Sequence, residues 1–301
     1  MTTGTHIEVR GLTKTFGAIH AVEDLSFEVA PGRVTGFLGP NGSGKTTTLR
    51  CLLGLVKPTA GLATIGGQKY SALNNPTTEV GAALEATGFH PGRTARNHLR
   101  VVAAAAHLPT KRVDEVLELV GLADDGGRRV GGYSLGMRQR LQLATTLLGD
   151  PGVVVLDEPA NGLDPGGIAW LRAFLRSLAA EGRTVLVSSH VLSEVEQTVD
   201  DVIIIAKGRL VRACTLRELT TSRTAAVIVR SPDAQRFAAI LTSEFAARVT
   251  EVDGVLSIEG LSAEEIGRAA YGHSVELHEL HDDRTDLEQI FLQLTDGQSG
   301  S

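Results

Sequence analysis

A glycine-rich stretch between an apolar strand and a helix constrains this chain more than any other feature. The apolar run RVTGFLG, residues 33–39, leads directly into PNGSGK, and the following TTTLRCLLGL has helical spacing. Residues 39–46 match the pattern of a phosphate-binding loop, in which glycines let backbone amides converge on a phosphate group. Such a loop requires the order strand, loop, helix. We predict that this segment binds a nucleotide. The alternative is that a glycine-rich chain matches the phosphate-loop pattern by chance.

The residue types within this loop suit the parts of a nucleotide. In this pattern Lys45 supplies a positive charge for the β and γ phosphates, and the hydroxyl of Thr46 can ligate Mg²⁺. The helix that follows turns the positive end of its dipole toward the anion. The predicted nucleotide-binding residues of the loop are Gly39, Pro40, Asn41, Gly42, Ser43, Gly44, Lys45, Thr46 and Thr47.

Two carboxylates at the end of another apolar run form a candidate catalytic pair. VVVLD places Asp157 at the end of a buried strand, where it can hold Mg²⁺, and Glu158 beside it can orient or deprotonate a water. His190 ends the run TVLVSSH, at the edge where parallel sheets bind ligands. Taken alone, the acidic pair is as easily structural as functional, and a structural role is the simpler interpretation of the histidine. Beside the phosphate loop, we predict that Glu158 and His190 are catalytic.

The composition and the order of elements indicate an α/β protein. The chain has 301 residues, of which 42% are hydrophobic and 21% charged, so it is long enough for one large domain and a small second one. Apolar strands alternate with helices, which implies a mostly parallel sheet covered on both faces, preceded by antiparallel strands. We expect strands over 6–16, 25–33, 33–39, 153–157 and 184–190, and helices over 46–55, 93–122, 134–149 and 168–182.

The pattern changes after residue 222. Six basic and fourteen acidic residues between 223 and 301 give this part a net charge of −8, which leaves +2 for residues 1–222. The expected order is βαββαβ plus one helix, a small α+β ferredoxin-like module attached through residues 216–222. Its strands are expected over 224–230, 247–252, 254–260 and 274–280, and its helices over 233–245, 262–271 and 286–294. An acidic tail and a near-neutral body argue against nucleic acid as a partner.

The segment YSLGMRQR, residues 133–140, resembles the signature sequence of the ATP-binding cassette (ABC) ATPases. It stands 23 residues before Asp157. The common form has two glycines and a glutamine where Leu135, Gly136 and Met137 stand, whereas the serine and one glycine are kept. The resemblance implies a P-loop NTPase cassette over residues 5–215, with an antiparallel β subdomain and a helical signature lobe over about 86–149. An accessory domain would then occupy residues 223–295.

The same resemblance assigns further residues of the ATP and Mg²⁺ site. Phe16 matches the aromatic residue that stacks on adenine, and Asp164 ends the ANGLD loop that couples two sites. Ser134 and Gly136 would close over the γ-phosphate held by a second copy of the chain. Glu85 stands where most members carry a glutamine that senses Mg²⁺ and the attacking water. A carboxylate accepts hydrogen bonds but does not donate them, so we expect its role at the metal to differ.

Several segments together most resemble the ATPase subunits of two-component exporters of the daunorubicin- and bacitracin-resistance type. They are VGAALE (80–85), GFHPGRTARNHL (88–99), YSLGMRQRL (133–141) and LEQIFLQLT (287–295). The resemblance implies that the chain drives a separately encoded integral membrane permease in antibiotic export or self-resistance. Residues 85–99 would be the docking surface for the permease; an ordinary solvated lobe is the alternative.

The location and the rival functions follow from what the sequence lacks. The first twenty-five residues show no secretion signal, and no apolar run approaches the roughly 20 residues that span a bilayer. With Cys51 and Cys214 as the only cysteines, we expect no disulfide partner. We therefore expect a cytoplasmic protein, peripheral on the inner face of the membrane through the permease.

Two other functions remain as alternatives to a transporter subunit. One is a soluble ABC protein acting on ribosomes or nucleic acid, and the other is a P-loop kinase or GTPase.

Overall fold

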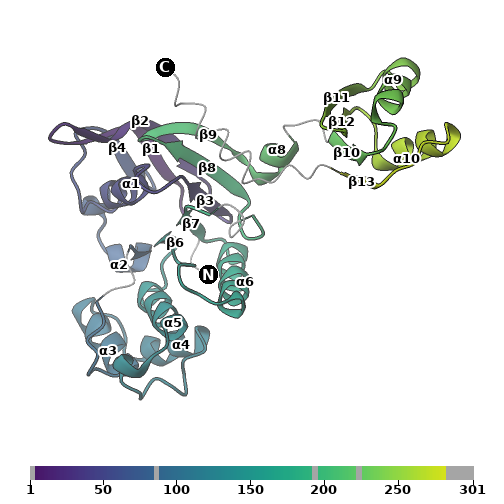
Figure 1. Ribbon diagram of the computed structural model, residues 1–301. Helices are drawn as coiled ribbons and strands as arrows, with labels where there is room; N and C mark the ends of the chain where they lie inside the picture. Colours follow the sequence, from purple (N-terminus) through teal and green to yellow (C-terminus); the bar gives the residue numbers. More distant parts are fainter. Residues whose placement is uncertain (1–3, 85–87, 192–195, 222–225, 283–301) are drawn as a thin grey trace. The chain divides into compact units, whose positions relative to one another are not determined.

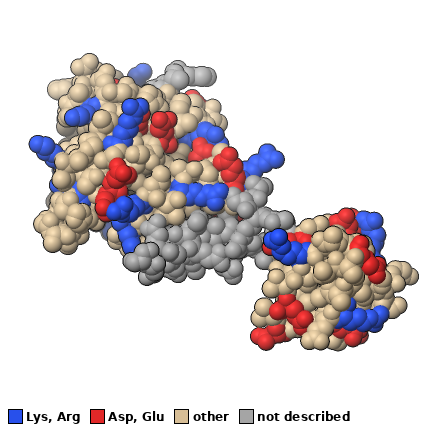
Figure 2. All heavy atoms as spheres, turned by 90° about the horizontal axis from the view of Figure 1, so that it is seen from above, with Lys and Arg blue, Asp and Glu red and all other residues tan. Residues whose placement is uncertain are grey.

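The computed structural model describes residues 4–84, 88–191, 196–221 and 226–282 (Figure 1). The described chain divides into two compact units, with the boundary between Leu216 and Arg217. Figure 2 shows acidic and basic side chains interspersed over the visible surface of each unit. The visible surfaces therefore carry no continuous basic stripe of the kind that binds duplex nucleic acid. Among the described helices, none has the length and apolar character needed to cross a bilayer.

A six-stranded sheet forms the centre of the first unit. Its strand order is β5-β6-β7-β3-β8-β9, in which the first five strands pair in parallel and β9 is antiparallel to β8. Every residue of β3 and β7 is buried, so these strands are covered on both faces, as the uninterrupted apolar runs predicted. The strands are β3 (Val34–Leu38), β5 (Val80–Ala83), β6 (Val153–Asp157), β7 (Thr184–Ser189), β8 (Asp201–Ala206) and β9 (Arg209–Thr215).

A second, antiparallel sheet has the strand order β2-β1-β4. It consists of β1 (Ile7–Phe16), β2 (Ile19–Val29) and β4 (Ala60–Ile65). The sequence predicted β2 only from Leu25, but its pairing with β1 extends back to the pair Phe16 and Ile19, which makes a tight hairpin. The predicted antiparallel start is confirmed.

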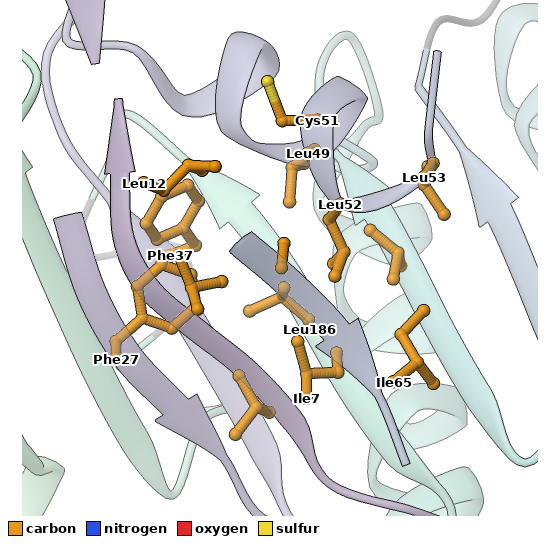
Figure 3. Packing of buried hydrophobic residues seen from close by; sticks show 14 of the residues in the cluster. Ile7, Leu12, Phe27, Phe37, Leu49, Cys51, Leu52, Leu53, Ile65 and Leu186 are labelled. Atoms are coloured by element: carbon orange, nitrogen blue, oxygen red, sulfur yellow. The ribbon is translucent and has the colours of Figure 1, made fainter. Parts of the chain in front are cut away.

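An apolar core of the first unit lies between the two sheets and α1 (Lys45–Leu52) (Figure 3). Phe27 of β2 and Phe37 of β3 pack with ring centroids 5.3 Å apart. Leu49 and Leu52 of α1 and Leu186 of β7 complete the same cluster. This packing fixes α1 to the sheet, and with it the glycine-rich loop that precedes the helix.

The predicted helical stretch 93–122 is two helices. α3 (Ala95–Ala105) ends before His107, whose φ is 54°, and α4 (Lys111–Leu119) begins after Pro109. Proline has no N–H and its ring clashes with the preceding turn, so a continuous helix cannot pass through it. The lobe also contains η2 (Val130–Gly132) and α5 (Leu135–Thr146). Two short helices, η1 (Tyr70–Ala72) and α2 (Pro76–Glu79), lie between β4 and β5.

Helix α6 (Pro165–Ala180) begins three residues before its predicted start. Asp164 caps it by accepting a hydrogen bond from Gly167 N at 2.8 Å, and proline occupies the first helical position, where its missing N–H costs nothing. The side chains of Leu171, Leu175 and Leu178 bury the inner face of the helix.

The second unit has the element order predicted from the sequence. Its antiparallel sheet has the strand order β11-β12-β10-β13, the arrangement of a ferredoxin-like βαββαβ module. One face of the sheet shares an apolar cluster with Phe237 and Ile266 of the two helices. The elements are α8 (Leu216–Thr221), β10 (Ala226–Arg230), α9 (Ala234–Phe245), β11 (Arg248–Val252), β12 (Val255–Glu259), α10 (Ala263–Gly272) and β13 (Glu279–Asp282).

The last strand lies later in the chain than the predicted range of 274–280. Its pairing with β10 begins at Glu279, which lies opposite Arg230, the last residue of β10. Of the residues before Glu279, His278 still donates its backbone N–H to Arg230 O, at the point where β10 ends. The helix predicted over 286–294 lies outside the described residues.

Candidate nucleotide-binding site

The glycine-rich loop joins β3 to α1 with its glycines in close contact with other backbone. Gly44 precedes α1 with a φ of 103°, and a Cβ there would lie 2.4 Å from Ala21 O. A Cβ on Gly39 would lie 2.5 Å from Ile205 O, so neither position admits a side chain without displacement. Ser43 is 3% exposed, and its Oγ has no hydrogen-bond partner among the described residues. With the free N–H groups of the first helical turn, the loop offers several donors for an anion.

Lys45 lies inside this loop. Its side chain is 6% exposed, and its Nζ donates to Gly39 O at 2.7 Å and to Pro40 O at 3.3 Å. The same Nζ lies 3.3 Å from Glu158 Oε1. The lysine thus places a positive charge between the loop and the end of β6. Pro40, Asn41 and Gly42 form the exposed part of the loop, and Thr47 is half-buried in the first turn of α1.

The hydroxyl of Thr46 and the carboxylate of Asp157 lie side by side where α1 begins and β6 ends. Thr46 Oγ1 donates to Asp157 Oδ2 at 2.7 Å, and Ser188 donates to Asp157 Oδ1. A hydroxyl and a carboxylate are the hard oxygen donors that Mg²⁺ prefers, so these residues fit the predicted metal. The third predicted metal residue, Glu85, lies outside the described residues.

Glu158 and His190 are brought together by the parallel pairing of β6 with β7. His190 Nδ1 lies 2.8 Å from Glu158 Oε2, while the backbone N of Glu158 donates to Ser188 Oγ at 2.9 Å. Glu158 adopts a φ of 49°, the left-handed region that non-glycine residues seldom occupy. Glu158 therefore lies between Lys45 and His190, with its backbone fixed by the neighbouring strand.

Sequence reasoning did not select Ser188, which touches both members of the acidic pair. The signal was present, because TVLVSSH places two serines at the end of an otherwise apolar strand. Its hydroxyl donates to Asp157 and accepts from the Glu158 amide, so it orients both residues. Ser188 is fully buried.

Phe16 lies at the end of β1 with 47% of its surface exposed. The Nζ of Lys14 lies 4.6 Å from the centroid of the ring, a cation–π contact that sequence reasoning did not anticipate. An exposed ring held on one side by a cation leaves an aromatic surface for a planar base.

The remaining predicted residues form a separate group. Ser134 caps α5 by accepting from Met137 N at 3.3 Å, as Asp164 caps α6. Ser134, Gly136 and Asp164 line one cavity of about 540 Å³. Within one chain, therefore, these three residues share a cavity that no residue of the phosphate loop lines.

Comparison with known proteins identifies relatives over nearly the whole chain. The bacitracin transport ATP-binding protein BcrA of Bacillus licheniformis is 36% identical over 300 residues, covering 97% of this chain and 98% of the relative. The Nod factor export ATP-binding protein I of Burkholderia lata is 37% identical over 303 residues, covering 96% of each chain. The lantibiotic transport ATP-binding protein SrtF of Streptococcus pyogenes is 34% identical over 205 residues, covering 68% of this chain and 89% of the relative.

Family models and solved structures agree with these relatives. The ABC transporter family model matches residues 22–161, and a domain of unknown function, DUF8746, matches residues 225–288. A solved ATP-binding subunit of an ABC transporter has a TM-score of 0.64 at 28% identity and covers 72% of this chain and 93% of its own. A nucleotide-free ATP-binding cassette, at 21% identity and a TM-score of 0.61, shares the fold. The chain therefore belongs to the ATP-binding subunits of ABC transporters and is an ABC-type ATPase.

Proposed function

We propose that this ATPase subunit drives a separately encoded membrane permease that exports an antibiotic or a related natural product. The observation that carries the catalytic part is the network of Lys45, Thr46, Asp157, Glu158 and His190 around the phosphate loop. The transport part rests on the relatives, whose names state bacitracin transport, lantibiotic transport and Nod factor export. We assign catalysis to residues 5–215 and an accessory role to residues 223–295.

The mechanism assigns one role to each group of the network. The loop amides and Lys45 bind the phosphates of ATP. Glu158 accepts a hydrogen bond from the attacking water and draws its proton, while His190 holds the other carboxylate oxygen of Glu158. Mg²⁺, bound by Thr46 and Asp157, would neutralise the charge of the phosphates. Phe16 stacks on adenine.

The site of one chain is, in this proposal, half of a complete site. Ser134, Gly136 and Asp164 share a cavity that no residue of their own chain's phosphate loop lines, and they present a serine hydroxyl and the start of a helix. These groups suit an anion. We propose that these three residues complete the nucleotide site of a second copy. ATP binding would then close a dimer, and this closure would move the permease.

Glu158→Gln tests the catalytic part. The amide keeps the size of the side chain but cannot take a proton, so steady-state phosphate release should fall by about 100-fold or more while ATP binding persists. Binding is measured by equilibrium titration and turnover by phosphate release. Near-normal turnover in this variant would remove Glu158 from its role. Transfer of phosphate to an acceptor instead of its release would favour a kinase.

A shallow basic groove on the helical lobe supports the permease partner. The groove has a volume of about 760 Å³ and is lined by His90, Gly92, Arg93, Thr94, Asn97, Arg100, Val101, Ala104 and Arg129. In the described part of the chain, no ion pair joins its three guanidinium groups to an acidic side chain. Val101, at 52% exposure, adds an apolar contact. The groove therefore fits an amphipathic segment of the permease that carries acidic side chains.

Charge reversal in the groove tests this docking surface. Arg93→Glu with Arg100→Glu should abolish co-purification with the permease partner, because like charges repel across the interface. ATP binding by the isolated chain should stay unchanged. Lys111→Glu, on the exposed start of α4 outside the groove, is the matched control. Unchanged co-purification of the double variant would mean that the groove is an ordinary solvated surface.

A further inference from the structure

One arginine of the signature helix joins three elements of the first unit. The Cζ atom of Arg140 lies 4.1 Å from the centroid of the Trp170 ring on α6. Its Nη1 donates to Val120 O, at the end of α4, at 3.1 Å. Arg140 itself belongs to α5. A single side chain thus connects two helices of the helical lobe with the helix that follows the catalytic strand.

The neighbouring residues leave room for the Arg140 side chain and restrict its ring partner. Gly121 follows α4 with a φ of 70°, and a Cβ at this position would lie 3.0 Å from Arg140 Nη1. The Trp170 ring stacks on Phe174, with centroids 5.1 Å apart and planes inclined by 13°. Trp170 therefore has limited freedom to turn away from the guanidinium. Arg140 and Trp170 are both half-buried, so water screens their contact only in part.

This joint connects the signature segment with the segment that follows Glu158. Ser134 caps α5, and Asp164, the last residue of the loop that follows Glu158, caps α6. A second contact joins α5 to that loop. The buried Gln139 donates through Nε2 to Asn161 O at 3.4 Å. Since helices move as rigid units, the contact between Arg140 and Trp170 sets the direction in which Ser134 faces relative to Glu158.

We propose that Arg140 is a positioning residue for ATP hydrolysis. By holding α5 against α6, it keeps Ser134 in the orientation that completes the nucleotide site of the second copy. Its contacts are Val120 O and the Trp170 ring, and it lines the same cavity as Ser134, Gly136 and Asp164, with no residue of the phosphate loop in that lining. The inference rests on the proposed function, in which Ser134 of one chain faces the nucleotide of the other.

The chain carries its own probe for this contact, because Trp170 is its only tryptophan. Arg140→Met keeps an unbranched apolar side chain but removes the guanidinium, and with it the cation and the hydrogen bond to Val120. The Trp170 emission should shift to longer wavelength as water replaces the guanidinium. The turnover number should fall by roughly tenfold or more, because small misplacements in a site lower the rate steeply. ATP binding to the phosphate loop of dilute, monomeric protein should stay within twofold of wild type, about 0.4 kcal/mol.

Two further variants separate positioning from stability. Arg140→Lys keeps a cation beside the indole and should recover part of the lost turnover, whereas a purely structural role predicts no link between charge and rate. Arg176→Met removes an exposed arginine from α6 and should change neither emission nor turnover. If Arg140→Met does not fold, Trp170→Leu tests the contact from the other side and should lower the turnover number to a similar degree. If both single variants fold, the double variant should be no slower than either of them.

The outcomes distinguish this inference from the function on which it rests. Wild-type turnover in Arg140→Met, with the Trp170 emission shifted, would overturn the positioning role and leave the ATPase assignment intact. A loss of loop ATP binding equal to the loss of turnover would also overturn it. Absence of hydrolysis in the wild-type chain would instead overturn the proposed function, and the positioning role with it.

Discussion

In the proposed mechanism, the contact between Lys45 and Glu158 helps to position the carboxylate that activates water. The ammonium lies 3.3 Å from one oxygen of Glu158, and His190 lies 2.8 Å from the other. The glutamate is thus held at both oxygens, and its backbone N is bonded to Ser188. A carboxylate fixed in this way directs a water with little freedom of its own, which lowers the entropic part of the barrier.

Thr46→Val tests the metal-binding residues. Valine has the shape of threonine without the hydroxyl that bonds to Asp157, so the Mg²⁺ concentration at half-maximal hydrolysis should rise about tenfold. A magnesium titration of phosphate release measures the change. Thr242→Val, which removes an exposed hydroxyl from α9, is the control and should leave the titration unchanged. An unchanged titration in Thr46→Val would contradict the assignment.

The two cysteines should differ in reactivity. Burial raises the pKa of the Cys51 thiol, with an opposing effect of Lys14, so little thiolate forms near neutral pH. Cys214 is only half-buried on the edge strand β9. Iodoacetamide should therefore modify Cys214 first, as followed by mass spectrometry of digested protein, and both at similar rates in denaturant. Faster modification of Cys51 in native protein would contradict the packing of α1 against the sheets.

Sequence reasoning selected the residues of the phosphate loop, Asp157, Glu158 and His190 because each lies beside a local pattern. Sequence reasoning did not select Ser188, since its partner Asp157 lies on another strand, and it did not select Lys14, whose contact with Phe16 two residues later on β1 depends on side-chain conformation. Ser188 reaches Asp157 only because β7 pairs with β6 in a register that places the two residues side by side. That register is a property of the sheet and has no local signal.

At the level of elements, the start of α5 lies beside the loop that joins Glu158 to α6. Gly162 of this loop has a φ of 75°, and a Cβ there would lie 2.4 Å from Leu135 Cδ2. A side chain at this position would have to displace the exposed side chain of Leu135. The position therefore links the start of α5 to the segment that follows Glu158.

Gly162→Ala should destabilise the first unit through both backbone strain and this clash. Gly182→Ala is the matched control, because Gly182 has a φ of 89° and nothing within 4 Å of a Cβ. Strain alone should cost about 1 kcal/mol at either position, and Gly162→Ala should lose more. Urea unfolding followed by Trp170 fluorescence measures both. Equal losses would show that α5 and the loop separate freely.

The elements themselves were largely predictable, and the errors have physical causes. The apolar runs of β3, β6 and β7 identified the parallel sheet because strands buried on both faces carry no polar alternation. The break between α3 and α4 was missed although Pro109 marks it, since apolar spacing continues across the turn. β13 was placed too early because an alternating pattern does not show where its partner strand ends.

In the whole molecule, each unit has its own apolar core. The core of the second unit contains the fully buried Phe237, together with residues of its own strands and helices. The first unit contains all the predicted site residues that the structure describes. Nucleotide binding should therefore depend on the first core and be insensitive to the second.

Phe237→Ala tests this independence. Removal of a fully buried aromatic ring should destabilise the second unit by about 3–5 kcal/mol, enough to unfold a small module. Limited proteolysis should then degrade residues after the boundary at Leu216 while ATP binding persists. Phe245→Ala, on the same helix with 40% of the ring exposed, should have little effect. Loss of ATP binding in Phe237→Ala would show that the two units fold together.

The central claim is that two copies share each ATP, and sedimentation of Glu158→Gln tests it most directly. This variant should bind ATP without consuming it, so with ATP and Mg²⁺ it should sediment with the mass of two chains. Without nucleotide, or with Ser134→Arg added, it should sediment as one chain. A Glu158→Gln protein that is saturated with ATP and still sediments as one chain would contradict the account.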